Sequence, residues 1–165
     1  MKTIYVAGGC FWGVSHYYDQ LKGVIKSTVG YANGMTENPT YQEVCSQTTN
    51  YAETVKVEYD ETIISLENIV DHLMRMIDPT SLNKQANDIG TQYRSGIYSS
   101  ELEEVKTIAE LVASYQPNYR KPIVVEVKEL SSFYEAEEYH QKYLVKNING
   151  YCHIDFSLIK EDEKK

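Results

Sequence analysis

Segments with the two-residue period of a β-strand alternate along this chain with segments that have the helical period. We expect strands at residues 3–7, 24–32, 53–59 and 123–128, and helices at residues 11–21, 65–77, 100–112 and 132–144. Ser65 is the expected cap of the second helix, and the third and fourth start with capping-box spacing, at Ser100 with Glu103 and Ser132 with Glu135. This alternation indicates an α/β or α+β domain whose central sheet is covered by helices.

The size and composition of the chain fit one globular domain. At 165 residues it can bury one core, which we place in a domain at residues 1–159, followed by a charged tail at 160–165 that is expected to be solvated. A net charge of −8 without a dense block of Lys and Arg argues against nucleic acid as a partner. The sequence has neither a signal-peptide pattern nor a membrane-spanning stretch, so we expect a cytoplasmic protein that does not bind membranes.

Cys10 carries the strongest indication of reactivity. The chain has three widely separated cysteines, which do not resemble the disulfide framework of a small secreted domain, so thiol chemistry is the alternative. Cys10 follows two glycines and opens a predicted helix, and the N–H groups and dipole of a helix N-terminus lower the pKa of a thiol. Phe11 and Trp12 follow it, and two consecutive helical positions cannot both face the core. At least one of these aromatic rings is therefore expected to line the mouth of a site.

Glu53 stands at an unusual position for a carboxyl group. In the strand predicted at residues 53–59, Val55, Val57 and Tyr59 share one face, and Glu53 has the same parity. A carboxyl group on the apolar face is partly desolvated, which favours its neutral form and keeps a proton available near neutral pH. The pattern therefore predicts a buried general acid.

Further motifs follow one another in a fixed order. They are VGY at 29–31, NPTY at 38–41, VC at 44–45, AE at 52–53, DPT at 78–80, ND at 87–88, GTQYRS at 90–95, HQKYL at 140–144 and NGYC at 149–152. Together with GCFWG at 9–13, they resemble the peptide methionine sulfoxide reductases of the A type over most of the chain. This resemblance implies a two-layer ferredoxin-like core with a mixed central sheet covered by helices and a long irregular C-terminal segment.

The same resemblance implies a role for each polar residue of the site. Cys10 would attack the sulfur of methionine sulfoxide, and Glu53 would protonate the departing oxygen. Tyr41 and Tyr93 match the phenols that hydrogen-bond the sulfoxide oxygen, and phenols donate without titrating near neutral pH. Asp88 matches an acid that orders this pocket, through water.

The resemblance also implies a substrate-binding wall and a redox cycle. Phe11 and Trp12 would accept the methyl group on sulfur and select the S epimer. Attack would leave Cys10 as a sulfenic acid, which Cys152 would condense with to form a disulfide. Thioredoxin or a small dithiol would reduce this disulfide, and neither a prosthetic cofactor nor a metal is implied. Cys45 is expected to be a buried structural thiol.

Three departures from the family pattern concern the surroundings of the site. Ser15 and His16 stand where the family has an acid first, which predicts that a salt link or polar contact behind the catalytic helix is missing. Asn50 and Tyr51 replace a Gly-His pair, which alters the surroundings of Glu53. Since no cysteine follows Cys152, a direct disulfide with Cys10 is implied rather than a three-thiol relay.

Three other functions remain open on the sequence. A cysteine hydrolase or acyl transferase would need a histidine base, for which the chain offers His16, His72, His140 and His153. A metal site at Cys152 and His153 lacks the usual ligand spacing. A non-enzymatic module could hold a methionine side chain with the same aromatic residues. We expect a monomer whose substrate is methionine sulfoxide, free or in proteins.

Overall fold

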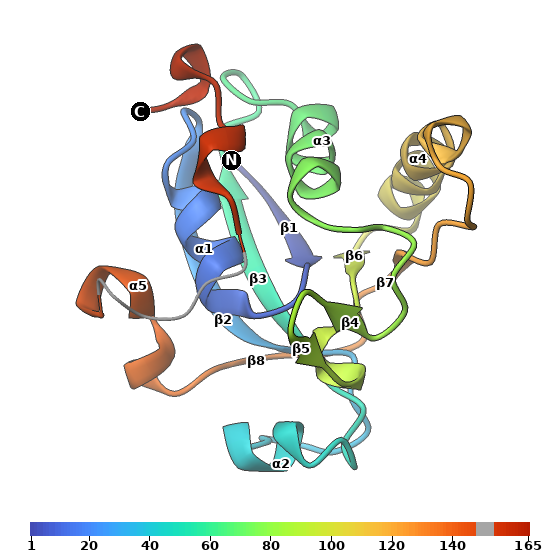
Figure 1. Ribbon diagram of the computed structural model, residues 1–165. Coiled ribbons are helices and arrows are strands. Elements are labelled where there is room, and N and C mark those ends of the chain that lie inside the picture. Colours follow the sequence, from blue (N-terminus) through green and yellow to red (C-terminus); the bar gives the residue numbers. More distant parts are fainter. Residues whose placement is uncertain (148–153) are drawn as a thin grey trace.

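A six-stranded sheet forms the centre of the protein in the computed structural model, which describes residues 1–147 and 154–165 (Figure 1). The strand order is β7-β6-β1-β3-β2-β8, and only β6 and β7 run parallel among these neighbours. The strands are β1 (Lys2–Ala7), β2 (Val24–Ala32), β3 (Ala52–Tyr59), β6 (Gly96–Ser99), β7 (Glu126–Glu129) and β8 (Phe133–Glu135). A separate two-stranded ribbon pairs β4 (Lys84–Gln85) with β5 (Asp88–Ile89).

Helices cover one face of this sheet and hold the main core against it. The helices are α1 (Phe11–Asp19), α2 (Tyr41–Cys45), α3 (Leu66–Met76), α4 (Leu102–Ala113) and α5 (Tyr143–Lys146). Single turns of 3-10 helix lie at Thr91–Tyr93, Gln116–Asn118, Glu138–His140, Phe156–Leu158 and Glu161–Glu163. Ile4 and Val6 of β1 point into the main core, whereas Ala7 belongs to a small second cluster.

The order of the central elements confirms the predicted fold class. β1, α1, β2, β3, α3 and β6 follow one another as a βαββαβ unit whose strands lie in the order β6-β1-β3-β2. This is the ferredoxin-like arrangement, with β7 and β8 added at the two edges. Two predictions hold in detail: the second strand spans residues 24–32, and the hydroxyl of Ser65 caps α3 by accepting a hydrogen bond from the Asn68 N–H.

The predicted capping box at Ser100 is wrong. α4 begins after Glu101, and Ser99 supplies the local polar contacts. Its hydroxyl oxygen accepts a hydrogen bond from the Glu101 N–H, and the hydroxyl donates to the carboxylate of Glu104. The hydrogen-bonding side chain therefore comes from the end of β6, one residue earlier than the motif suggested.

The predicted helix at residues 132–144 is also wrong. Phe133–Glu135 forms the edge strand β8, which pairs with Gly30, Tyr31 and Ala32 of β2. The exposed edge of β2 offers backbone partners that a local helical pattern cannot reveal. Helical structure returns only at the single turn Glu138–His140 and at α5.

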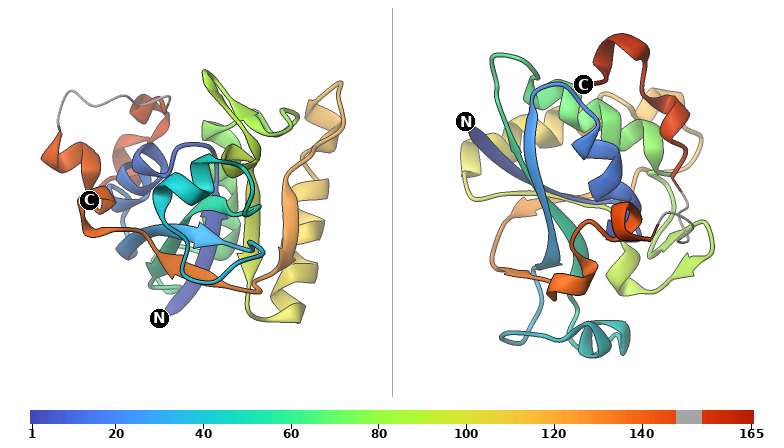
Figure 2. Two further views of the ribbon diagram at one scale, coloured as in Figure 1. Left: turned by 90° about the horizontal axis from the view of Figure 1, so that it is seen from below. Right: turned by 90° about the vertical axis from the view of Figure 1, so that its left-hand side faces the viewer.

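The last six residues, which we expected to form a solvated tail, are mostly exposed and are joined to the rest of the protein by an ion pair and backbone hydrogen bonds. The Glu163 carboxylate accepts hydrogen bonds of 2.8 and 2.9 Å from two nitrogens of Arg75 on α3. The Glu163 carbonyl accepts from the Lys22 N–H, and the Lys165 N–H donates to the Gln20 carbonyl. The C-terminus consequently lies beside the end of α1 (Figure 2). Within residues 1–147 and 154–165, no helix is long and apolar enough to cross a membrane.

Candidate active site

Cys10 lies at the point where β1 turns into α1. Gly9 has a φ of +90°, a backbone conformation that glycine adopts without the penalty of a side chain. A Cβ atom on Gly8 would come within 2.9 Å of Ile77, so glycine also allows the turn to pack under α3. Cys10 is the N-cap residue of α1 and its exposed fraction is 7%. As expected from the sequence, its thiol stands at the positive end of the helix dipole.

Glu53 meets this helix N-terminus from β3. Its Oε1 accepts a hydrogen bond of 3.2 Å from the N–H of Phe11, the residue after Cys10, while Oε2 has no hydrogen-bond partner among the described residues. Only 1% of Glu53 is exposed, which confirms the burial predicted from strand parity. Burial raises the pKa of Glu53 to about 8, the Phe11 N–H opposes this rise, and the charge of Asp88 adds to it. The carboxyl group is therefore mostly protonated at neutral pH.

The two tyrosines predicted for the site reach the same space from separate segments. Tyr41 opens α2 after a capping box at Thr40, and Tyr93 ends the single turn Thr91–Tyr93. Burial raises the pKa of both phenols, and the charge of Glu53 raises each further. The charges of Asp88 and Cys10 also raise the pKa of Tyr93. The structure thus brings these five predicted residues together.

An aromatic wall stands beside the thiol. Phe11 is 1% exposed, and its ring centroid lies 6.5 Å from that of Tyr41 in a stacked arrangement. Trp12 is only partly buried, as expected for the second of two consecutive helical positions. Its ring stacks on Tyr143 with centroids 3.7 Å apart, and its Nε1–H donates a 3.0 Å hydrogen bond to Nδ1 of His140.

His140 and Tyr143 were missed as members of the site by sequence reasoning, although the HQKYL motif contained both. His140 is 2% exposed, and burial lowers the pKa of its ring. Because the indole can only donate, Nδ1 of His140 must accept, so the neutral ring carries its proton on Nε2. Because Trp12 occupies the lone pair of Nδ1 and Nε2 carries the proton, the His140 ring has no free lone pair with which to act as a general base.

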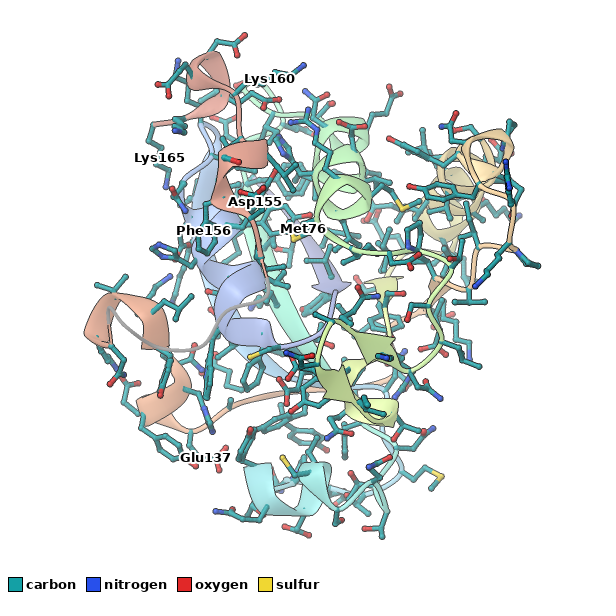
Figure 3. The ribbon with its side chains drawn as sticks, viewed as in Figure 1. Met76, Glu137, Asp155, Phe156, Lys160 and Lys165 are labelled. Atoms are coloured by element: carbon teal, nitrogen blue, oxygen red, sulfur yellow. The ribbon has the colours of Figure 1, made fainter. Side chains whose placement is uncertain are left out.

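Glu137 and Cys45 are two further neighbours of Tyr41. Glu137 accepts hydrogen bonds from the Tyr31 hydroxyl at 2.8 Å and from the Tyr41 N–H at 3.1 Å, which ties α2 to the segment after β8 (Figure 3). Burial raises the pKa of the Cys45 thiol, and the Tyr41 side chain beside it opposes this rise. Cys45 is partly exposed, so the prediction of a buried structural thiol is wrong.

The departures from the family pattern have local structural counterparts. The Ser15 hydroxyl lies 2.6 Å from that of Ser27, and Asp19, one helical turn later, forms a 2.6 Å ion pair with Lys142. The predicted loss of a salt link or polar contact is therefore wrong, because Ser15 makes a polar contact and Asp19 supplies the acid of a salt link. Asn50 has a φ of +59°, and its carbonyl accepts a hydrogen bond from Arg94.

Two predictions concern residues outside the described part of the chain. Cys152, the expected resolving thiol, lies among residues 148–153, as does His153, which the alternative metal site would use. Within the described ranges, no three His, Cys, Asp or Glu side chains are grouped as metal ligands would be.

Comparison with known proteins assigns the family. The sequence model of the family described as peptide methionine sulfoxide reductase matches residues 2–165. The chain belongs to this family. A peptide methionine sulfoxide reductase MsrA of Clostridium botulinum (strain Okra / Type B1) is 57% identical over 154 residues, which are 93% of this chain and 98% of the relative.

Solved structures of family members agree with the fold. The methionine sulfoxide reductase A of Corynebacterium diphtheriae superposes with a TM-score of 0.87 at 38% identity, covering 92% of this chain and 77% of the other. Mxr1 from Saccharomyces cerevisiae, solved in complex with Trx2, superposes with a TM-score of 0.61 at 29% identity, covering 86% and 84%. The mixed sheet covered by helices is therefore a feature shared with this reductase family.

Proposed function

We propose that this chain reduces methionine S-sulfoxide, free or within proteins, to methionine, with Cys10 as the nucleophile. The observation that carries the proposal is the Glu53 carboxyl group, buried and hydrogen-bonded to the N–H that follows Cys10. A sulfoxide needs a proton on its oxygen when a thiolate attacks its sulfur, and the raised pKa of Glu53 keeps that proton available at neutral pH.

In the first step an oxygen atom passes from the substrate sulfur to Cys10, and two electrons pass from Cys10 to the substrate sulfur. Cys10 Sγ attacks the sulfoxide sulfur while Glu53 protonates the oxygen, and the phenols of Tyr41 and Tyr93 donate hydrogen bonds to that oxygen. The bond that forms between Sγ and the substrate sulfur breaks again as the oxygen passes from that sulfur to Sγ, so the S–O bond of the substrate is lost, methionine leaves and Cys10 becomes a sulfenic acid. The Cys10 sulfur is thereby oxidised by two electrons and the substrate sulfur is reduced by two.

The aromatic wall supplies the binding energy and the selectivity. Phe11 and Trp12 stand directly after the nucleophile and offer apolar surface for the methyl group on sulfur. With the methyl group on this wall and the oxygen at the hydrogen-bond donors, only one configuration at sulfur lets the rest of the substrate extend away from Cys10. This geometry supports selection of one epimer, and the family resemblance implies that it is the S form.

A second thiol closes the cycle. Cys152 attacks the Cys10 sulfenic acid, water leaves, and a disulfide forms. A dithiol then reduces this disulfide by exchange, and thioredoxin is the reductant that we propose. The solved complex of yeast Mxr1 with Trx2, at 29% identity, supports that partner. The cytoplasmic location and the monomeric state remain predictions.

An epimer-resolved assay tests the proposal. The parent protein and Cys10→Ser are incubated with dithiothreitol and either methionine S-sulfoxide or methionine R-sulfoxide, and methionine is measured. We expect the parent to consume only the S form and the variant to consume neither. Equal consumption by parent and variant would exclude the thiol mechanism, and equal loss of both epimers would exclude the proposed selectivity. A cysteine hydrolase, the main alternative, would show no loss of titratable thiols after one turnover.

A further inference from the structure

The segment that follows β8 determines how Trp12 is held. His140 accepts the hydrogen bond of the indole N–H, and Tyr143 stacks on the face of the indole with an interplanar angle of 11°. These two residues lie on either side of Gln141 and Lys142 in the sequence. The position of the indole therefore depends on what fixes these two residues.

Gln141 is fixed to β2, and Lys142 is fixed to β2 and to the C-terminal end of α1. The Gln141 side chain accepts from the Val29 N–H at 3.0 Å and donates to the Val29 carbonyl at 2.9 Å, which continues the pairing at the edge of β2. The Lys142 ammonium group donates to Asp19 Oδ2 at 2.6 Å and to the Ser27 carbonyl at 3.1 Å. Asp19 is held in turn by the Ser27 hydroxyl, which donates to Oδ1 at 2.7 Å.

The backbone conformation of Lys142 is a second, independent observation that its side-chain contacts with Asp19 and Ser27 hold the segment in place. Its φ of +56° and ψ of +35° lie in the left-handed region, which non-glycine residues adopt at a cost. The chain uses this conformation to leave the turn Glu138–His140 and begin α5, so that His140 and Tyr143 both face Trp12. The side-chain contacts of Lys142 with Asp19 and Ser27 help to offset this cost.

We propose that the Asp19–Lys142 ion pair holds Trp12 in position. It thereby also positions the aromatic wall that binds the substrate methyl group. It acts at a distance from the reacting atoms, because Asp19 lies at the opposite end of α1 from Cys10. The effect on catalysis rests on the proposed function, whereas the effect on the position of Trp12 does not.

Two variants remove the ion pair from opposite sides. Asp19→Asn removes the charge, and Lys142→Asn removes the ammonium group while keeping a residue that tolerates the left-handed conformation. Since Trp12 is the only tryptophan of the chain, its fluorescence reports this site directly. We expect the emission maximum of both variants to shift to longer wavelength and quenching by acrylamide to increase.

The same variants are assayed with methionine S-sulfoxide and dithiothreitol. Because the wall binds substrate and transition state alike, we expect KM to rise about fivefold while kcat stays within about twofold of the parent. The double variant should show the effect of one substitution and not the product of two, since both break the same contact. Lys142→Arg, which retains the charge, should restore most of the parental fluorescence and KM.

A neighbouring ion pair on the same segment provides the control. Glu138→Gln removes the charge of the Lys146–Glu138 pair, whose carboxylate side chain is 90% exposed, and keeps the hydrogen bond from Lys146 to the Glu138 carbonyl, so it should leave both fluorescence and KM unchanged. Thermal unfolding and circular dichroism of each variant establish that the fold is retained. Parental fluorescence and KM in the two Asn variants would overturn the proposal, as would additive effects in the double variant. If the parent itself reduces no sulfoxide, the proposed function fails, while the fluorescence of the variants still decides the positioning role.

Discussion

Replacement of Glu53 by Gln isolates the energetic cost of burying a carboxyl group in this site. In an unfolded chain the pKa of a glutamate is near 4.5, whereas burial raises the pKa of Glu53 to about 8 in the folded protein. The unfolded state therefore ionises first as the pH rises, and ionisation favours unfolding. The contribution of Glu53 to stability is therefore most favourable below pH 4.5 and falls progressively until the pH reaches about 8.

The magnitude follows from these two pKa values. At about 1.4 kcal/mol for each pH unit, the loss of stability amounts to roughly 3 kcal/mol at pH 7 and roughly 5 kcal/mol above pH 8. A glutamine has nearly the same volume, carries no charge and can still accept the hydrogen bond from the Phe11 N–H. We therefore expect Glu53→Gln to be more stable than the parent by roughly 3 kcal/mol at pH 7, and about equally stable at pH 4.5.

Urea denaturation between pH 4.5 and pH 8.5 measures this difference. Glu110→Gln, an exposed position on α4, serves as the matched control and should give the same free energy of unfolding as the parent at each pH. Activity should change in the opposite direction, since the variant has no proton to donate to the sulfoxide oxygen. A stability difference between Glu53→Gln and the parent that is the same at pH 4.5 and pH 8 would refute the assignment of a buried, neutral carboxyl group.

Other substitutions test separate parts of the site and fold. Cys152→Ser should give one turnover with thioredoxin and near-normal turnover with a small thiol, as measured by methionine released per enzyme; full thioredoxin-driven turnover would exclude the resolving role. Tyr41→Phe should slow single-turnover formation of the sulfenic acid about 10- to 100-fold, because one donor to the oxygen is lost. Glu163→Gln should lower the free energy of unfolding by roughly 1–2 kcal/mol in urea at pH 7. Arg75 holds the pKa of Glu163 at about 2, so this difference should disappear as the pH falls from 4.5 to about 2.

The parts of the protein with a clear period could be predicted from the sequence. The strand at 24–32 was predicted at its full length. The burial of Glu53 on β3 follows from alternation, because its apolar neighbours of the same parity face the main core. The position of Cys10 at a helix N-terminus follows from two glycines between a strand and an amphipathic segment. In these segments, local preference and tertiary packing agree.

The segment after residue 130 could not be predicted in the same way. Its Ser132 and Glu135 match a helix start, yet pairing with β2 decides the structure, and the partners are about a hundred residues away in sequence. Trp12 and His140, which are hydrogen-bonded, are 128 positions apart. Contacts of single side chains over such separations leave no periodic pattern, so a shared motif was the only sign of them.

Glu53 and Trp12, on the two sides of the site, are consequently held in different ways: Glu53 by the hydrogen-bonded sheet, and Trp12 by side-chain contacts. Glu53 lies on β3, which is hydrogen-bonded to β1 on one side and to β2 on the other, so the costly buried carboxyl group is held by the most extensively paired strand. Trp12 depends instead on His140 and Tyr143, and their segment is fixed largely by side chains such as Gln141 and Lys142. A proton donor must keep its position throughout the reaction, whereas Cys152, on the same C-terminal segment as His140, must reach Cys10 in the proposed cycle. Support by a few side-chain contacts makes opening of residues 137–147 less costly than opening of the sheet.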